Sequence, residues 1–409
     1  MGAYDSDRAW AWAMAGTGPR RWASLGASSL DPQRALAVAS GAVAARRSFR
    51  LAESATPSSA AAILTQLDAD LQAGWAVAGY WSYELGAALE RAEFGPGPLA
   101  DAEWICFDPK DLKEVLLPDT PKRVASEPPP IPADLARQEQ AYLRSAAEVL
   151  EKINAGQVYQ VNLTAEVTQP FAGWPDALTA LAAVQNVQPV PFAAVFQGSA
   201  QMLICGSMER FLSVAGRQVC SRPIKGTAPR HPLADMDASI AQMLQQAPKE
   251  RAENIMIVDM VRNDLQRAAV QGSVQVAELL EAVAYTTLWH LESEVTATLA
   301  ESGKLGPLLQ ATMPPASVTG CPKIQAMHVI AQLEQRCRGP YCGALGIAFP
   351  DGSADLAVAI RTLWLDGECA RFGVGAGLVA DSVPAAEWAE TCLKARSPLA
   401  ILDLLRGSP

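Results

Sequence analysis

The chain contains segments with the hydrophobic period of a helix and shorter apolar segments with the period of a strand, in an irregular order. Helices are predicted at 137–155, which has an amphipathic pattern, at 249–265, whose apolar residues indicate substantial burial, and at 385–405. Residues 158–167 alternate between apolar and polar side chains, which predicts a strand. Short apolar segments separated by glycine and polar turns predict antiparallel strands at 193–196, 202–204, 211–214 and 218–221.

The remaining elements are distributed irregularly. We expect a helix at 60–71, and a strand or hairpin at 74–83. Further strands are expected at 342–349, 356–363 and 369–374. Strand clusters and helix clusters do not alternate as regular βαβ units, and this disfavours a doubly wound parallel sheet.

Residues 116–133 (LPDTPKRVASEPPPIPAD) have the composition of a linker. Three consecutive prolines cannot continue a helix or a sheet. This segment divides the chain into an N-terminal region, 1–115, and a larger region, 134–409, and we expect the two to pack as one globule.

Composition restricts the class of protein. Of the 409 residues, 50% are hydrophobic and 19% are charged, which is enough for a sizeable core and excludes a disordered acidic chain. The net charge of −10 argues against a broad nucleic-acid-binding surface, which needs a basic face. An anionic small substrate stays possible, because a local cationic pocket can lie in an acidic protein.

The eight cysteines form no CxxC pair and no zinc-type cluster with histidine. Scattered single cysteines are typical of buried small side chains in a reducing compartment. No apolar run approaches the ~18 residues of a membrane span, and the first residues lack the pattern of a signal peptide. We therefore expect a cytoplasmic protein that binds neither membrane nor nucleic acid.

Two predicted helices each carry a pair of glutamates three residues apart, so that both members share one face. Glu250 and Glu253 begin one helix, where acidic residues are favoured by the helix dipole in any case. Glu387 and Glu390 begin the other, and Glu390 has Lys394 four residues later, which is also the spacing of an ordinary surface pair. Two such helices in one chain make a Mg²⁺ site between them a reasonable hypothesis.

The segment CSRPIKGTAPR, 220–230, places Lys225 between an apolar stretch and a Gly-Thr turn. A lone lysine is usually a surface residue. A lysine fixed in a constrained, desolvated site can instead lose its proton and act as a nucleophile or base. Gly226 and Thr227 could offer N–H and hydroxyl donors to a carboxylate.

The segment GVGAG, 373–377, predicts a close approach of the backbone to an anion. Its glycine spacing and the following Asp-Ser-Val-Pro do not fit a dinucleotide-binding turn, so a carboxylate is the expected ligand. Among three histidines, His290 is flanked by apolar and aromatic residues. A histidine there is more often a hydrogen-bonded core residue than a catalytic one.

Taken together and in this order, the motifs resemble the chorismate-utilising enzymes, which include anthranilate synthase large subunits and the aminodeoxychorismate, isochorismate and salicylate synthases. The resemblance extends from about residue 138 to residue 401. Its landmarks are VYQVNLT (158–164), MERFL (208–212), PIKGT (223–227), RAENIMIVDMVRNDL (251–265), HLES (290–293), SVTGCPK (317–323), RGPYCGALG (338–346), AIRT (359–362), GVGAG and EWAETCLKAR (387–396 from its first glutamate). It implies an α+β fold of antiparallel sheets packed face to face, with outer helices and the active site in a cleft between two subdomains.

The same resemblance implies the roles of individual residues. Lys225 is expected to attack C2 of chorismate, Glu209 to protonate the departing 4-hydroxyl, and His290 to assist or to orient the ring. Mg²⁺ is expected at Glu253 and Glu390, with Glu250 and Glu387 close by, and with the ring carboxylate as its partner. The second carboxylate and the rest of the pocket are assigned to Tyr341, Arg361, the backbone of Gly375, Ala376 and Gly377, and to Gly226, Thr227, Thr319, Gly320 and Lys394.

Two positions indicate the branch of the family. Members that add water resemble one another in carrying lysine where this chain has Gln160, and anthranilate-forming members carry alanine at the position of Lys225. The chain therefore resembles most the members that form aminodeoxychorismate for p-aminobenzoate and folate. An anthranilate-forming enzyme and a non-catalytic chorismate-binding subunit are the alternatives.

No glutaminase motif is found, so ammonia is expected from a separate glutaminase subunit or from free ammonium. A tryptophan pocket is a further feature of the family. The segments Leu51-Ala52-Glu53-Ser54 and Pro191-Phe192 could match it.

Overall fold

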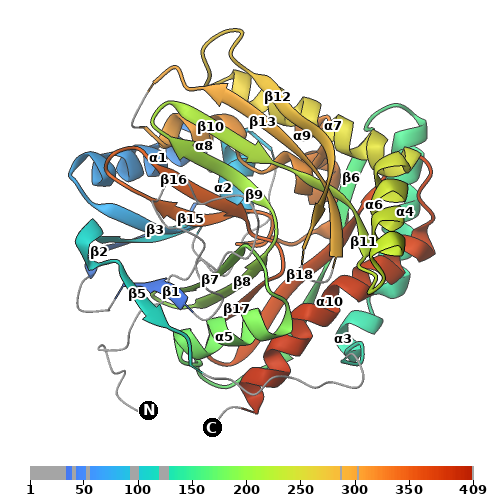
Figure 1. Ribbon diagram of the computed structural model, residues 1–409, viewed down its shortest axis with the longest axis horizontal. Coiled ribbons are helices and arrows are strands. Elements are labelled where there is room, and N and C mark those ends of the chain that lie inside the picture. The colour runs from blue at the N-terminus through green and yellow to red at the C-terminus, as the bar shows by residue number, and fades with distance from the viewer. Residues whose placement is uncertain are drawn as a thin grey trace.

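The computed structural model shows a chain whose strands form two large antiparallel sheets (Figure 1). A separate two-stranded pair joins β1 (Arg34–Ala37) to β5 (Lys113–Leu116). The described residues are 34–38, 43–51, 56–92, 101–118, 129–285, 288–301 and 304–407.

Ten strands form the larger sheet, and they come from both ends of the chain. In spatial order they are β11 (Ile224–Pro229), β13 (Leu288–Thr298), β10 (Gln218–Arg222), β9 (Arg210–Ala215), β16 (Ala354–Val358), β15 (Ala344–Ala348), β3 (Ala76–Trp81), β4 (Ala102–Phe107) and β2 (Val43–Phe49), while β12 (Gln275–Ala284) also pairs with β13. Strand β15 is paired over its whole length with β3. The predicted N-terminal and larger regions therefore contribute to one sheet, whereas most of the predicted linker lies outside the described residues.

The smaller sheet has six strands. In spatial order they are β14 (Gly320–Cys321), β6 (Gln160–Pro170), β18 (Cys369–Leu378), β17 (Thr362–Leu365), β8 (Met202–Ser207) and β7 (Phe192–Gln197). Strands β6 and β18 pair over ten positions and form the longest strand pair of this sheet.

Helices cover the sheets. They are α1 (Pro57–Gln72), α2 (Tyr83–Leu89), α3 (Ala133–Ala136), α4 (Glu139–Asn154), α5 (Ala177–Val187), α6 (Ala234–Gln246), α7 (Pro248–Gln266), α8 (Gly306–Thr312), α9 (Lys323–Glu334) and α10 (Pro384–Arg406), with 3₁₀ turns η2 (Pro109–Asp111) and η3 (Ala316–Val318). Side chains of Thr56 and Asp176 cap the first turns of α1 and α5 by accepting hydrogen bonds from backbone N–H groups.

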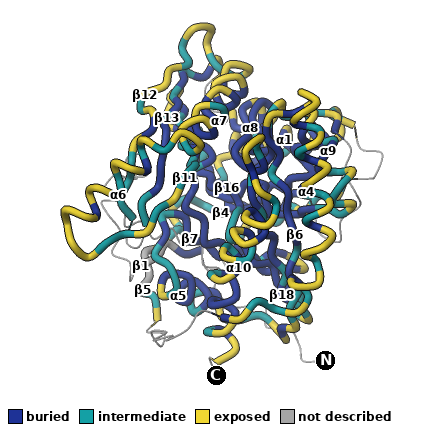
Figure 2. Tube along the Cα trace, turned by 90° about the vertical axis from the view of Figure 1, so that its right-hand side faces the viewer, coloured by how far each residue is buried: buried dark blue, intermediate teal, exposed yellow. Residues whose placement is uncertain are grey.

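Packing produces one continuous core. Helices α5 and α10 lie against the six-stranded sheet, α7 packs on β13, and one buried apolar cluster includes residues from both sheets. Figure 2 shows the strands as mostly buried and the helices as exposed on their outer faces. The predicted α+β fold of antiparallel sheets with outer helices is confirmed.

Three local predictions need correction. The single strand expected at 356–363 is two strands, β16 and β17, which belong to different sheets because Arg361 has φ 51° and redirects the chain between them. The Gly-Thr turn after Lys225 is instead part of β11, where Gly226 (φ 86°) lies at a shift of register. The strand expected at 369–374 is longer than predicted, because β18 extends to Leu378 and includes the whole GVGAG segment.

Candidate active site

Lys225 lies on β11 at the shift of register against β13. The residue is half-buried, and its desolvation lowers the pKa of the amine, although the nearby carboxylates of Glu253 and Glu209 favour the charged form. The amine is therefore more easily deprotonated here than in water, which is what a nucleophile requires.

Glu209 is 5% exposed and immediately precedes β9. Its carboxyl group accepts hydrogen bonds from the Ser317 hydroxyl and from the backbone N–H of Ile224. Burial raises the pKa of Glu209 to about 7, although Ser317 and the charge of Lys225 act in the opposite direction. A substantial fraction of this group is thus protonated at neutral pH and available as an acid.

Gln160 and Gly377 form the wall beside Lys225. A Cβ atom on Gly377 would lie 2.7 Å from Nε2 of Gln160 and 3.6 Å from Nζ of Lys225. Gln160 is fully buried, and neither its Nε2 nor its Oε1 has a hydrogen-bond partner among the described residues. Nδ2 of Asn162 is also buried and has no hydrogen-bond partner among the described residues. Buried amides without partners are costly, so these groups are suited to a polar ligand beside the amine.

The GVGAG half of β18 is paired on one edge only. Strand β17 covers Ala370, Arg371 and Phe372, whereas the residues that follow pair with β6 alone within the described part of the sheet. The ring of Tyr341 packs directly on Gly373, where any Cβ atom would overlap it at 2.0 Å. Backbone N–H groups of this edge are therefore available for the anion contact that the sequence analysis expects.

A chain of hydrogen bonds connects Arg361 with this edge. Nη1 of Arg361 donates to the carbonyl oxygen of Lys394 at 2.7 Å, and Nζ of Lys394 donates to that of Gly375 at 3.0 Å. Burial lowers the pKa of Arg361, although Tyr341 and Glu390 favour its charge. The structure thus brings Lys394, which was predicted to complete the pocket, together with the residues predicted for the second carboxylate: Tyr341, Arg361, Gly375, Ala376 and Gly377.

His290 lies on β13, and its Nδ1 is 3.0 Å from the Thr227 hydroxyl. Burial lowers the pKa of His290 to about 4, so the ring is neutral at physiological pH. The ring also meets Tyr285 edge-on, with 5.0 Å between centroids. His290 is therefore placed to orient Thr227, and a direct catalytic role stays a prediction.

Thr319 and Gly320 lie along the edge of β6, because Gly320 begins β14, which pairs with that strand, and the carbonyl oxygen of Thr319 accepts from the N–H of Asn162. The Thr319 hydroxyl donates to the carbonyl oxygen of Pro315 at 2.8 Å, so its proton is already used within the loop. A Cβ on Gly320 would meet the carbonyl oxygen of Gln160 at 2.3 Å. These two residues support the strand that carries Gln160.

Lysine side chains pair with glutamates of α7 and α10, and Lys249 is shared between the two helices. Nζ of Lys249 lies 3.9 Å from Oε1 of Glu253 and 3.3 Å from Oε1 of Glu387, while Lys394 pairs with Glu390 at 2.6 Å. A Cβ on Gly226 would lie 3.0 Å from Oε2 of Glu250, so that carboxylate reaches the Lys225 strand.

This donor set suits Mg²⁺. Burial raises the pKa of Glu250 and of Glu253. The charged form of each carboxylate is therefore disfavoured, and a cation bound nearby would stabilise it. An ammonium group already stands between Glu253 and Glu387, which shows that a cation is stable there. Among the described residues no three acidic, histidine or cysteine side chains are close enough to enclose a metal by themselves. Substrate and water oxygens would have to complete the coordination, as is usual for Mg²⁺.

Several residues of the site were not singled out from the sequence. Ser317 lies within the SVTGCPK motif, and Lys249 stands four residues before Glu253, which is the only local signal for it. Arg338 donates from Nη1 to the carbonyl oxygen of Val318 at 3.0 Å and from Nη2 to that of Asn162 at 2.6 Å. For the predicted tryptophan pocket, Ser54 lies outside the described residues, and Pro191 alone gives no test of it.

A family model described as chorismate binding enzyme matches residues 22–400. The chain belongs to this family. No helix within the described ranges combines the length and the apolar character that crossing a membrane requires.

The curated relatives include both aminodeoxychorismate synthases and anthranilate synthases. The chain is 40% identical over 276 residues to an aminodeoxychorismate synthase of Streptomyces griseus, covering 66% of this chain and 38% of that protein. It is 36% identical over 288 residues to anthranilate synthase component 1 of Thermus thermophilus, covering 70% and 62%. It is also 38% identical to aminodeoxychorismate synthase component 1 of Escherichia coli, covering 60% and 53%. The matches thus span less than two thirds of these relatives.

Solved structures share the fold. Anthranilate synthase component I from Streptococcus pneumoniae superimposes with a TM-score of 0.72 at 23% identity, over 94% of this chain and 98% of that one. The menaquinone-specific isochorismate synthase MenF from Escherichia coli gives a TM-score of 0.68 at 16% identity, over 98% and 92%.

Proposed function

We propose that this enzyme converts chorismate and ammonia to 4-amino-4-deoxychorismate, which another protein would cleave to p-aminobenzoate for folate. The observation that carries the proposal is the pairing of Lys225, whose pKa is lowered, with Glu209, whose pKa is raised, beside the unpartnered Gln160. The aminodeoxychorismate synthase relatives at 38% to 40% identity support it.

The reaction balances as two displacements. The neutral Lys225 amine forms a bond to C2, the ring double bond shifts, and the 4-hydroxyl leaves as water with the proton of Glu209. Ammonia then forms a bond to C4, the double bond returns, and Lys225 leaves C2 as a neutral amine. The nitrogen that has been added gives its surplus proton to Glu209, which restores the enzyme.

Two carboxylates of chorismate need separate partners. Glu250, Glu253, Glu387 and Glu390 would hold Mg²⁺, which supplies positive charge to the ring carboxylate when it is bound. Arg361, with its planar fork, would bind the other carboxylate together with Tyr341 and the open edge of β18.

Ammonia would come from a separate glutaminase subunit, and free ammonium would replace it in vitro. The Escherichia coli relative is named component 1, which supports an enzyme made of separate subunits. The eight cysteines are all free, which supports a reducing, cytoplasmic location.

Anthranilate formation is the second candidate, because the Thermus thermophilus relative is nearly as similar as the aminodeoxychorismate synthases. The lysine at position 225 argues against it, since the resemblance associates alanine there with anthranilate.

Product identity separates the two candidates. The purified chain is incubated with chorismate, Mg²⁺ and ammonium at alkaline pH, with and without an aminodeoxychorismate lyase, and the products are separated by chromatography. We expect p-aminobenzoate only when the lyase is present. Fluorescent anthranilate formed without the lyase would overturn the proposal in favour of the second candidate.

A further inference from the structure

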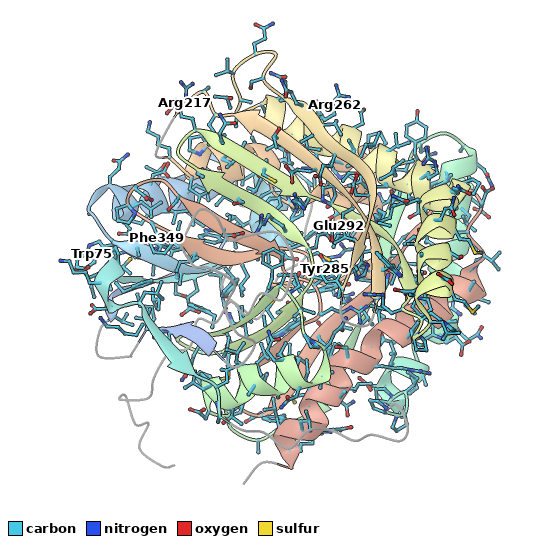
Figure 3. The ribbon with its side chains drawn as sticks, in the orientation of Figure 1. Trp75, Arg217, Arg262, Tyr285, Glu292 and Phe349 are labelled. Atoms are coloured by element: carbon cyan, nitrogen blue, oxygen red, sulfur yellow. The ribbon has the colours of Figure 1, made fainter. Side chains whose placement is uncertain are left out.

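Helix α2 of the N-terminal region and a loop of the candidate active site lie at the same end of the strand pair β3–β15. Trp75 and Phe349 flank the other end of this pair, towards the left side of Figure 3. At the end of interest, β3 leads into α2, and β15 is preceded by the loop 338–343, which contains Tyr341. The helix and the loop therefore begin side by side.

Glu84, on α2, holds the first residues of this loop. Its Oε1 accepts a hydrogen bond from the backbone N–H of Arg338 at 2.6 Å, and its Oε2 accepts one from the N–H of Gly339 at 2.9 Å. Successive backbone N–H groups that converge in this way form a concave site for an anion. Glu84 is 3% exposed, so its side chain occupies this site as a ligand supplied by the chain itself.

The loop is attached on both sides of Tyr341. On the near side, the backbone N–H of Tyr83 donates to the carbonyl oxygen of Gly339 at 3.0 Å, which adds a second contact from α2. On the far side, the N–H of Cys342 donates to the carbonyl oxygen of Ala359 at 3.0 Å. The position of Tyr341 between these attachments therefore depends on α2 as well as on the segment that leads to β17.

We propose that Glu84 is a positioning residue that places Tyr341 for the binding of the second carboxylate of chorismate. The inference rests on the role of Tyr341 given in the proposed function. Loss of the Glu84 carboxylate leaves two buried N–H groups without acceptors, so the loop has to move to satisfy them. The N-terminal region thereby contributes to substrate binding without touching the substrate.

The test compares Glu84→Gln with Asp68→Asn. The glutamine keeps the length of the side chain, but its amide group replaces one of the two acceptors by a donor. Asp68 is the matched control, because its Oδ1 also accepts from two successive backbone N–H groups, those of Leu305 and Gly306, each at 2.9 Å. KM and kcat are measured at alkaline pH as chorismate consumption with ammonium and saturating Mg²⁺. We expect Glu84→Gln to raise KM about tenfold and to change kcat by less than about threefold, and Asp68→Asn to leave KM within about twofold of the wild type.

A double variant separates positioning from general destabilisation. In a Tyr341→Phe background, Glu84→Gln should raise KM by less than about twofold, because the hydroxyl group through which Glu84 acts is already absent. Equal factors in the two backgrounds would overturn the proposal, as would an unchanged KM in folded Glu84→Gln or an equal rise in Asp68→Asn. If Glu84→Gln does not fold, Glu84→Asp, which is one methylene shorter, replaces it with the same expectation and the same grounds for rejection.

The proposed function is decided separately. Because chorismate consumption is followed whatever the product, a wild type that makes anthranilate would refute the proposed reaction without affecting this test. An unchanged KM in Tyr341→Phe alone would refute the role given to Tyr341, and with it this inference.

Discussion

Lys225 and Glu209 need opposite protonation states, and burial favours both. Desolvation disfavours the charged form of each group, so it lowers the pKa of the amine and raises that of the acid. Both shifts are in the direction that a neutral nucleophile and a protonated acid require.

Lys225→Ala should lower the rate of aminodeoxychorismate formation by about a thousandfold or more, because it removes the bond-forming group. Chorismate binding, measured by calorimetry with Mg²⁺, should change by less than about tenfold. Lys304→Ala, an exposed lysine far along the chain, serves as the control and should match the wild type. Full activity in Lys225→Ala would exclude a covalent role.

Gly377→Ala should raise the KM for chorismate by about tenfold and change kcat less. The added Cβ would lie 2.7 Å from Nε2 of Gln160, and therefore has to displace the wall beside Lys225. Gly206→Ala is the matched control, since its nearest neighbour would be at an ordinary 3.4 Å. An unchanged KM in Gly377→Ala would show that chorismate does not use this wall.

Individual site residues could be predicted from the sequence where they belong to a motif of the family. Lys225, Glu209 and the paired glutamates were predicted because their motifs carry the resemblance and helical spacing places them on one face. Ser317 and Lys249 were not, because their importance depends on partners more than a hundred residues away, which no local pattern records.

At the scale of elements, Arg338 joins separate parts of the pocket. It is 1% exposed, forms a buried ion pair with Glu334 at 2.7 Å, and donates to the carbonyl oxygens of Asn162 and Val318. The Arg338 guanidinium therefore connects β6, η3 and α9. These contacts help to position Gln160 on β6 and Ser317 on η3.

Arg338→Met should lower the free energy of unfolding by about 3–5 kcal/mol, because it leaves the buried Glu334 with less compensating charge. Denaturant unfolding followed by circular dichroism measures the change. Arg262→Met, which breaks an exposed pair with Asp259, should stay within about 0.5 kcal/mol of the wild type. Equal stability of both variants would contradict this account of Arg338.

Helices and most strands were predictable from periodicity, since each is a local pattern. The break at Arg361 was not, because a positive φ at an arginine has no sequence signal and is maintained by tertiary contacts, such as the Gly206 N–H that donates to its carbonyl oxygen at 3.0 Å. The irregularity at Gly226 was predicted as a turn, because the pairing of β11 with β13 that makes it part of a strand is a long-range contact.

For the whole molecule, the large buried core contains carboxyl groups that resist ionisation. Burial raises the pKa of Glu84 and of Asp355 to about 7, and that of Asp264 to about 6. Between the unfolded pKa of about 4 and these values, the native state binds more protons than the unfolded state. Each such group therefore makes the protein less stable as pH rises through this window.

Asp355→Asn isolates one of these groups. Relative to this variant, the free energy of unfolding of the wild type should fall by about 2–4 kcal/mol as pH rises from 5 to 8. The comparison cancels groups that act in the opposite direction, such as His290, whose pKa is lowered. A difference that is constant across this range would mean that Asp355 is ionised throughout.

The assembly of the sheets was beyond the sequence. Strand β3 pairs with β15, more than 250 residues later, and β11 pairs with β13 rather than with its neighbour β10. Such long-range pairing depends on the packing of complete faces, whereas periodicity specifies only that strands exist. The α+β class was reached from the resemblance of motifs.

The central claim is that Lys225 attacks chorismate, and mass spectrometry of the digested protein tests it most directly. The enzyme is mixed with chorismate and Mg²⁺ without ammonium, quenched in acid and digested. We predict an added mass equal to chorismate minus one water on the peptide that contains Lys225, and none in Lys225→Ala. Product formation on adding ammonium, with no adduct trapped at any time during turnover, would contradict the account.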